Sequence, residues 1–383
     1  MPAARKPIRR RHPSRRATTH SHDVGVIGGG IMGSACAWKL AEAGASVLVL
    51  EKSVPGAEAS SAAAGILGAC AEAHGPGPMA DLLLASAARY PDWSEALEQA
   101  TGLDVEYRRS GVLQVETTER GLRRAERRVE WMRGTERRFD VLGSRAVGRL
   151  EPRLAPRAGA VHFPNDARVD PKRLFRAVHI AAERAGARFE SGAQVDRVVA
   201  ARNRIEGVAL ENGETRRAPA VVVAAGSWSC QVRGTHLPKD AVIPARGQMV
   251  ELETPAPPLR HVVFGGGVYL VPRDDGRVLV GSTIEFVGYR REVTARAVRD
   301  LLAGAMALAP DLANATVGAS WSNFRPYTKT ELPIVGRSSV RGLLYATGHF
   351  RNGILLAPIT AEVVAALAGE KKPPLDPAPF ELR

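Results

Sequence analysis

Three glycines near the start of the chain, Gly28, Gly30 and Gly33, are followed by a carboxylate at Glu51, and these residue types at this spacing could hold a phosphate and a ribose. In a GxGxxG pattern the first glycine allows a tight turn, the second lets backbone approach a pyrophosphate, and the third lets a helix pack closely on a strand. The helix N-terminus offers unpaired N–H groups to phosphate. A carboxylate placed like Glu51 accepts hydrogen bonds from ribose hydroxyls and repels a 2′-phosphate. The pattern predicts a dinucleotide-binding site.

The elements needed to position these residues are present around them. Apolar residues 24–27 predict a strand, Gly44 can end the following helix in a left-handed conformation, and residues 46–51 predict a second strand that ends at the carboxylate. A glycine-rich turn without a ligand is the alternative for an isolated GxGxxG pattern. The complete series of strand, helix, strand and acidic residue favours the dinucleotide site.

Other catalytic motifs are absent from the sequence. The chain has no GxSxG, GxxxxGK[ST] or HExxH pattern and no Cys/His spacing typical of a metal site, and its nine histidines are scattered. We therefore expect no metal and no catalytic side chain, and we assign the chemistry to the bound dinucleotide. The residues alone leave a nicotinamide and a flavin cofactor both open.

The composition is that of a globular protein, with 45% hydrophobic and 24% charged residues. Residues 1–22 hold seven of the 53 Lys and Arg residues and no acidic residue, so they account for much of the net charge of +13. We expect them to form a disordered basic leader, with contact to RNA or an anionic surface as the alternative. Because the remainder is only mildly basic, nucleic acid is not an expected partner.

The chain carries no clear targeting or membrane signal. A secretory signal requires an apolar stretch after the basic residues, and none precedes the first predicted strand. The late apolar run 354–368 is short for a bilayer span and contains Pro358 and Glu362, so we expect no membrane span. The three cysteines are far apart and fit neither a disulfide framework nor structural zinc. These features predict a cytoplasmic protein.

Helical and strand-rich segments alternate along the chain, which predicts α/β architecture together with an α+β part, in two domains that are each discontinuous. Residues 120–138 predict a solvated, arginine-rich helix face, and the small residues 56–68 predict close approach to a ligand. The other predicted helices are 80–100, broken at Pro91, 171–185, 294–308 and 357–367. The predicted strands are 187–190, 194–199, 205–210, 221–225 and 343–346, with an antiparallel sheet between 241 and 285.

Three further segments decide between the cofactors. The chain carries SSAAAGILGACAE at 60–72, FRPYTKTELPIVG at 324–336 and GHFRNGILLAP at 348–358. In this order they resemble the D-amino-acid oxidase superfamily of FAD-dependent amine oxidoreductases, and within it the glycine oxidases. The resemblance covers about 23–370. It implies non-covalent FAD, because covalent relatives use a cysteine near the position of Arg325 and residues 300–360 contain none.

The resemblance also implies a domain division and a set of cofactor contacts. A Rossmann-like FAD-binding domain would comprise 23–85, 162–238 and 326–370, and an antiparallel-sheet substrate domain 86–161 and 239–325, between the leader 1–22 and a C-terminal tail 371–383. The helix after Gly353 would aim N–H groups at the flavin carbonyl. The expected FAD-binding residues are Gly28, Gly30, Ile31, Met32, Gly33, Glu51, Lys52, Ala59, Ser60, Ala64, Gly65, Ile66, Val195, His349, Phe350, Arg351, Asn352, Gly353, Ile354 and Leu355.

The resemblance assigns substrate binding to Arg325, Arg351 and Tyr269. A guanidinium suits an amino-acid carboxylate, because its planar fork binds both oxygens and keeps its charge. A surface salt bridge is the alternative for Arg325 without the motif. Where glycine oxidases commonly have a small residue after Arg-Pro, this chain has Tyr327, which we expect to narrow or reshape the pocket.

The implied reaction is oxidative deamination of glycine, sarcosine or small D-amino acids to an imine, then to a 2-oxo acid and ammonia, with dioxygen reduced to hydrogen peroxide. It would serve thiamine thiazole synthesis. One alternative is a dehydrogenase that uses an acceptor other than oxygen. The other is the FAD oxidase of a tRNA wobble-uridine-modifying enzyme. The expected partners are the small substrate, dioxygen and further copies of the chain.

Overall fold

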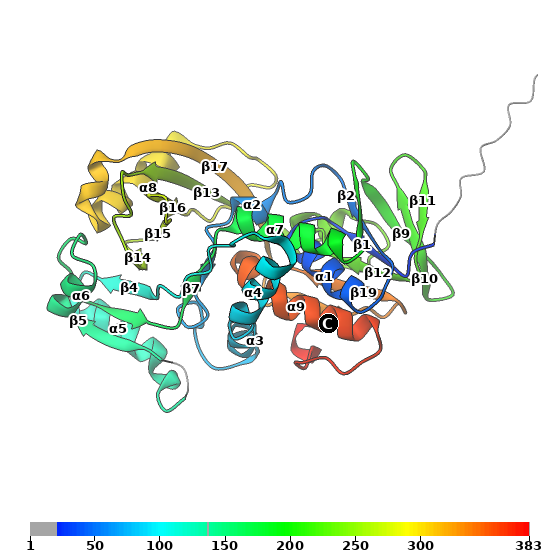
Figure 1. Ribbon diagram of the computed structural model, residues 1–383, viewed down its shortest axis with the longest axis horizontal. Helices are drawn as coiled ribbons and strands as arrows, with labels where there is room; N and C mark the ends of the chain where they lie inside the picture. The colour runs from blue at the N-terminus through cyan, green and yellow to red at the C-terminus, as the bar shows by residue number, and fades with distance from the viewer. Residues whose placement is uncertain (1–20, 136–137, 383) are drawn as a thin grey trace, which may run out of the picture.

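The computed structural model describes residues 21–135 and 138–382, and Figure 1 shows two lobes, each built on a large sheet. The predicted leader 1–22 lies outside the described residues except for its last two. His22 is buried, and its Nδ1 lies 3.0 Å from Ser46 Oγ. The described chain is therefore anchored to the first lobe from His22 onward.

The first lobe contains a six-stranded sheet in the order β18-β19-β12-β1-β2-β8. All neighbouring pairs are parallel except β18 with β19, as a doubly wound dinucleotide fold requires. The predicted first two strands are confirmed. The six strands are β1 (Val24–Ile27), β2 (Val47–Glu51), β8 (Arg188–Ser191), β12 (Ala220–Val223), β18 (Ile334–Arg337) and β19 (Leu343–Thr347).

Side chains alternate between the two faces of the parallel sheet along these strands, and both faces are covered by other elements. Val26 and Val49 pack with the helices, whereas Ile27 and Leu50 face a small antiparallel sheet. Helix α1 contacts α7 and α9, and α3 also contacts α9. The helices are α1 (Ile31–Glu42), α3 (Pro78–Ala87), α4 (Tyr90–Thr101), α7 (Pro171–Arg184) and α9 (Gly353–Ala368). The small sheet has β9 (Val195–Ala201), β10 (Arg204–Leu210) and β11 (Thr215–Arg217).

The second lobe is an eight-stranded sheet in the order β17-β13-β16-β15-β14-β4-β6-β5, antiparallel throughout except for β14 with β4. One face packs on α8, through residues such as Val250, Leu270 and Leu301. The strands are β4 (Val112–Glu116), β5 (Asp140–Gly143), β6 (Gly159–Phe163), β13 (Ile243–Glu253), β14 (Val262–Gly265), β15 (Val268–Pro272), β16 (Arg277–Gly281) and β17 (Thr316–Tyr327). Its helices are α5 (Glu119–Val129), α6 (Ser144–Leu150) and α8 (Ala295–Leu308).

The predicted fold class, α/β with an antiparallel-sheet part, is confirmed by these two sheets. The domain boundaries remain a prediction. The eight strands of the second sheet come from 112–163 and 243–327, whereas α4, which we placed in the substrate domain, packs against α7 beside the parallel sheet. The predicted tail holds Phe380, which is buried.

Most predicted elements are confirmed, with two shifts that have local causes. Residues 80–100 form two helices, because Pro91 lies in the first turn of α4, where proline is tolerated. The last helix begins at Gly353 rather than Ala357 and continues through Pro358. Asp170 caps α7 as expected, accepting hydrogen bonds from the N–H groups of Lys172 and Arg173.

The segment Phe350–Ala368 is long and apolar enough to cross a membrane by length and composition. However, 67% of it is buried inside the described protein, where it packs against α1 and α3. This burial is that of a core helix. Two short paired strands, β3 (Ile66–Leu67) and β7 (Ala167–Arg168), and helix α2 (Ala59–Ala62) lie between the two sheets.

Candidate active site

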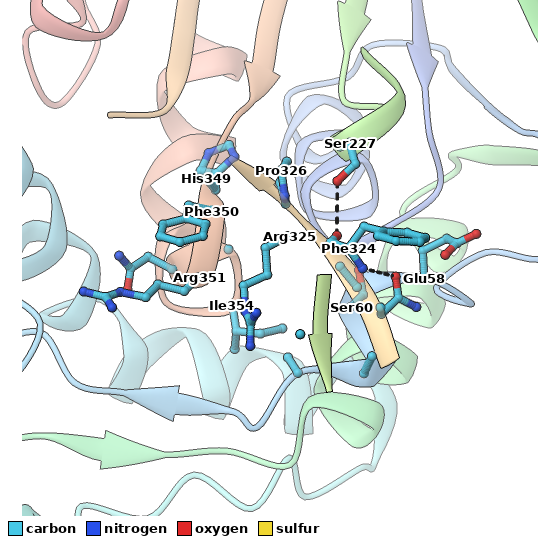
Figure 2. Close-up of a pocket in the computed structure, with 18 of the residues that line it drawn as sticks. Glu58, Ser60, Ser227, Phe324, Arg325, Pro326, His349, Phe350, Arg351 and Ile354 are labelled. Carbon is cyan, nitrogen blue, oxygen red and sulfur yellow. Dashed lines mark hydrogen bonds between the residues drawn. The ribbon is translucent and has the colours of Figure 1, made fainter. Parts of the chain in front are cut away.

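A cavity of about 1080 Å³ lies between the two lobes and is lined by residues from both. Figure 2 shows part of its wall, formed by β17, the start of α9 and the loop after β12. Each predicted site residue lines this cavity except Gly33 and Leu355. Residues distributed over more than 320 positions of sequence are thus brought to one space.

The glycine turn after β1 has the geometry that a pyrophosphate site needs. Gly28 has φ +103°, and a Cβ there would lie 2.6 Å from the Ala224 carbonyl oxygen. Gly30 is the N-cap residue of α1 and has no side chain to cap it, and Ser60 Oγ accepts from the Ile31 N–H at 2.8 Å. Gly33 serves packing, because its Cβ would lie 1.8 Å from the Gly28 carbonyl oxygen. The turn therefore leaves backbone N–H groups open toward the cavity.

Glu51 ends β2 beside this turn and is nearly buried. Its Oε2 accepts from the Gly29 N–H at 2.8 Å and its Oε1 from the Ser53 N–H at 2.9 Å. Oε1 also accepts from Ser53 Oγ at 3.4 Å, whereas Oε2 can accept a further hydrogen bond, so a ribose hydroxyl fits here. The side chain of Lys52 lies over Trp228, with Nζ 3.4 Å from the ring centroid. Burial lowers the pKa of Lys52, and the negative charge of Glu58 acts in the opposite direction.

Two other predicted cofactor regions also line the cavity. Val195 lines the cavity beside Ala193 and Gln194 at the start of β9. At the far end the residues before and at the start of α9 line the cavity, and again no described side chain caps the helix. Leu355 instead points into the core, and its carbonyl accepts from Ser86 Oγ at 2.6 Å. A second helix N-terminus thus faces the cavity where we expect the flavin carbonyl.

His349 lies at this second helix start but has no titrating role near neutral pH. It is buried, and its Nε2 lies 3.1 Å from Thr360 Oγ1. Burial lowers the pKa of His349 to about 3, so the ring stays neutral. It holds the turn before α9 in place.

The small-residue segment 62–66 is held by Arg273, a residue that sequence reasoning missed. Arg273 is fully buried; its Nη2 donates to the Ala64 carbonyl and its Nη1 to the Val169 carbonyl, both at 2.6 Å. Gly65 has φ +76° and accepts through its carbonyl from the Val169 N–H. The sequence signal that could have identified Arg273 is an arginine directly after an apolar strand, as in YLVPR.

Arg325 projects from β17 into the cavity (Figure 2). Its guanidinium passes over Gly247, where a Cβ would lie 2.1 Å from Nη1. It donates to the Thr283 carbonyl at 3.1 Å and to Ser282 Oγ at 2.5 Å, and within the described ranges no carboxylate forms an ion pair with it. A half-buried cation with neutral partners can take a carboxylate ligand.

Tyr269 lines the same part of the cavity from β15. Its ring covers Gly281 of the neighbouring strand, where a Cβ would lie 2.3 Å from the ring, and its hydroxyl is 3.7 Å from Met249 Sδ. Tyr327 was predicted to narrow or reshape the pocket, and this stays a prediction. Its ring is not among the lining residues, and its centroid lies 4.9 Å from that of Phe350, which does line the cavity.

Arg351 also lines the cavity but is directed away from Arg325 (Figure 2). Its Nε lies 2.6 Å from Glu72 Oε2 and its Nη2 lies 2.9 Å from His74 Nε2. The predicted solvated face of α5 is corrected in part, since Arg124 and Arg128 line the cavity. Their helical spacing did not show that this face meets a cavity.

The remaining chemical features agree with a cofactor held by shape and polar contacts. None of the three cysteines lines the cavity. In the part of the chain that the structure describes, no cluster of His, Cys, Asp and Glu could hold a metal. The glycine turn, the carboxylate beside it and the starts of α1 and α9, whose N-cap side chains make no capping hydrogen bond, all border one cavity, which fits FAD.

A dinucleotide fold whose cavity continues to a second sheet bearing an unpaired arginine defines a flavin-dependent oxidoreductase. The chain belongs to the FAD dependent oxidoreductase (DAO) family, whose profile matches residues 23–367.

Individual relatives match nearly the whole chain. It is 37% identical over 369 residues to glycine oxidase from Geobacillus kaustophilus, covering 95% of this chain and 97% of the relative. The crystal structure of glycine oxidase from Geobacillus kaustophilus matches with a TM-score of 0.90 over 95% of this chain and 99% of that one. The bifunctional protein ThiO/ThiG of Synechocystis sp. is 37% identical over 91% of this chain, which spans 52% of that relative.

Proposed function

We propose that this protein oxidises the C–N bond of glycine or a similarly small amine. Glycine, dioxygen and water would give glyoxylate, ammonia and hydrogen peroxide. The observation that carries the proposal is Arg325, a cation without a carboxylate partner among the described residues, on the cavity wall beside Tyr269. The likeness to glycine oxidases supports the reaction class.

The residues of this chain would act by binding and orientation. Arg325 would bind the substrate carboxylate through two parallel N–H···O hydrogen bonds, and the Tyr269 hydroxyl would add a third. Gly247 and Gly281 let these two side chains lie flat on the sheet, so that space remains above them. Bound FAD supplies the hydride acceptor, and no side-chain base is required.

The test is an amine panel with purified, FAD-loaded protein. Glycine, sarcosine, D-alanine and D-proline would each be assayed for peroxide, ammonia or methylamine, and oxygen uptake, with and without an artificial electron acceptor. We expect peroxide in proportion to amine consumed. Turnover only with the artificial acceptor would favour the dehydrogenase alternative, and no turnover under either condition would refute the proposal.

As part of this proposal, the site residues have the FAD-binding and substrate-binding roles that the family resemblance implies for them. We further propose a cytoplasmic enzyme whose imine product supplies thiamine thiazole synthesis, supported by the three free, widely spaced cysteines and by the family resemblance. Self-association also remains a proposal. No contact in the structure favours the tRNA-modifying alternative.

A further inference from the structure

A group of basic side chains lines the cavity beyond Arg325. We call His74, Arg128 and Arg351 the distal basic group, and Arg124 lines the cavity next to it. Arg124 and Arg128 lie one turn apart on α5, so they share a helix face. The cavity that holds the predicted carboxylate site thus has a second cationic region.

The distal basic group has fewer anionic contacts than cations. Arg351 pairs with Glu72 at 2.6 Å. Arg128 has neutral partners: its Nη1 donates to the Ala71 carbonyl at 3.1 Å, and its Nη2 donates to Gln114 Oε1. Arg128 Nε is buried without a hydrogen-bond partner in the described part of the chain. One guanidinium therefore lacks an ion-pair partner there.

His74 cannot satisfy both arginines. Its Nε2 lies 2.9 Å from Arg351 Nη2 and its Nδ1 lies 3.1 Å from Arg128 Nη1, so a donor faces each ring nitrogen. A neutral imidazole has one acceptor nitrogen and a protonated one has none. Burial, then the charges of Arg351 and Arg128, lower the pKa of His74, so it stays neutral. At His74, therefore, one of the two arginine N–H donors has no acceptor.

The hairpin tip Gly265–Gly267 also lines the cavity, and its residues Gly266 and Gly267 are exposed, so the cavity reaches the protein surface at this tip. Glu72 and Glu116 also line the cavity and act on Arg128 electrostatically, but no ion pair forms between Arg128 and a described carboxylate. An oxyanion between the two guanidiniums would accept a hydrogen bond from the arginine N–H that His74 cannot accept.

We propose that the distal basic group is a subsite for a second carboxylate on the substrate, so that the enzyme prefers amino acids bearing an additional carboxylate, such as N-carboxymethylglycine (iminodiacetate). This inference rests on the proposed function, with Arg325 taking the first carboxylate. The same C–N oxidation would convert iminodiacetate, dioxygen and water into glycine, glyoxylate and hydrogen peroxide.

The turnover test compares iminodiacetate with its monoamide, N-(carbamoylmethyl)glycine, which has the same shape and one carboxylate fewer. We expect kcat/KM to favour iminodiacetate at least tenfold. Arg128→Gln should bring the ratio to within threefold of one, and Arg128→Lys should restore part of it. Arg123→Gln, on the exposed face of α5, is the matched control and should keep the ratio. Equal rates for both compounds in the unmodified protein would overturn the subsite.

A binding test does not depend on turnover. Diglycolate has an ether oxygen in place of the amine and cannot be oxidised in this way, and methoxyacetate is its analogue with one carboxylate. Titration of the FAD-loaded protein, followed by flavin absorbance, should give a Kd at least tenfold lower for diglycolate, and Arg128→Gln should remove this difference. As a control, a mixture of methoxyacetate and acetate supplies the same two carboxylates on separate molecules. If that pair binds as tightly as diglycolate, the group takes a separate anion and the proposal is wrong.

The two tests separate the inference from the function it rests on. Selective diglycolate binding without oxidation of any amine would refute the proposed function and keep the anion subsite. Oxidation of glycine with equal binding of diglycolate and methoxyacetate would refute the subsite alone. Flavin occupancy and thermal unfolding of each variant exclude misfolding as the cause.

Discussion

Arg325 is the residue to which we assign recognition of a carboxylate, and its surroundings support this assignment. The side chain lies over Gly247 and is held by a carbonyl and a hydroxyl, which orient the guanidinium without neutralising it. Desolvation by the cavity strengthens its attraction for an anion. A surface arginine with a carboxylate partner would not have this property.

Replacing Arg325 with leucine should raise the KM for glycine by about 100-fold, because a charge-assisted pair contributes roughly 1.5–3 kcal/mol and tenfold corresponds to about 1.4 kcal/mol. Steady-state peroxide assays measure this. Arg299→Leu, which removes an exposed arginine of α8, is the control. An unchanged KM in Arg325→Leu would remove Arg325 from carboxylate binding.

His349 makes a separable contribution to the dependence of stability on pH. Its folded pKa of about 3 lies far below the value of about 6.5 expected for the unfolded chain, so only the unfolded state takes up this proton as pH falls through that window. The stability that His349 contributes is therefore fully present above about pH 6.5. It is lost as the pH falls below that value, by about 2 kcal/mol at pH 5.

Urea unfolding at pH 7.5 and pH 5 tests this dependence. Compared with the unmodified protein, His349→Gln should lose about 2 kcal/mol less between the two pH values, because glutamine does not titrate. Equal losses in the two proteins would show that His349 is not responsible.

At the scale of elements, the junction of β1 and α1 depends on the absence of a side chain at Gly33. A Cβ there would lie 1.8 Å from the Gly28 carbonyl oxygen, so the helix would have to move off the strand and the phosphate-binding turn with it. The uncapped start of α1 is useful to a ligand only while this contact is kept.

Gly33→Ala should destabilise the protein by more than about 2 kcal/mol and release FAD, since overpacking a fixed contact costs about 1–3 kcal/mol and this one involves backbone. Gly148→Ala in α6 is the matched control. Its Cβ would meet nothing within 4 Å, and helix propensity predicts a gain of about 0.5–1 kcal/mol. Thermal unfolding and free-flavin fluorescence measure both. Full FAD occupancy in Gly33→Ala would contradict this account.

At the scale of the molecule, the two lobes share one cavity, so the cofactor would connect them. The glycine turn and Glu51 come from the parallel sheet, whereas Arg325 and Tyr269 come from the antiparallel one. Because a ligand that binds only the folded state adds RT ln(1 + [L]/Kd), FAD should stabilise both lobes together.

Removal of FAD should therefore lower the free energy of unfolding by about 2.7 kcal/mol relative to protein at an FAD concentration of 100 Kd. Calorimetry of the two forms measures the change, and readdition of FAD should reverse it. The same unfolding temperature with and without FAD would show that the cavity does not hold the cofactor.

The sequence by itself determined the dinucleotide turn, the family and most of the residues that line the cavity, because each of these depends on local demands. Gly28 and Gly65 are needed where φ is positive, and Gly33 where a helix crosses a strand. Such demands leave a local pattern that can be recognised without coordinates.

Only the tertiary structure decided what surrounds the substrate. Gly247 lies below Arg325 and Gly281 below Tyr269 because of cross-strand register. The arginines of α5 line the cavity because that helix packs beside β4 and β6, far in sequence from Arg351. Contacts between distant segments leave no periodicity or motif in either segment, so the distal basic group was invisible in the sequence and became evident only in the fold.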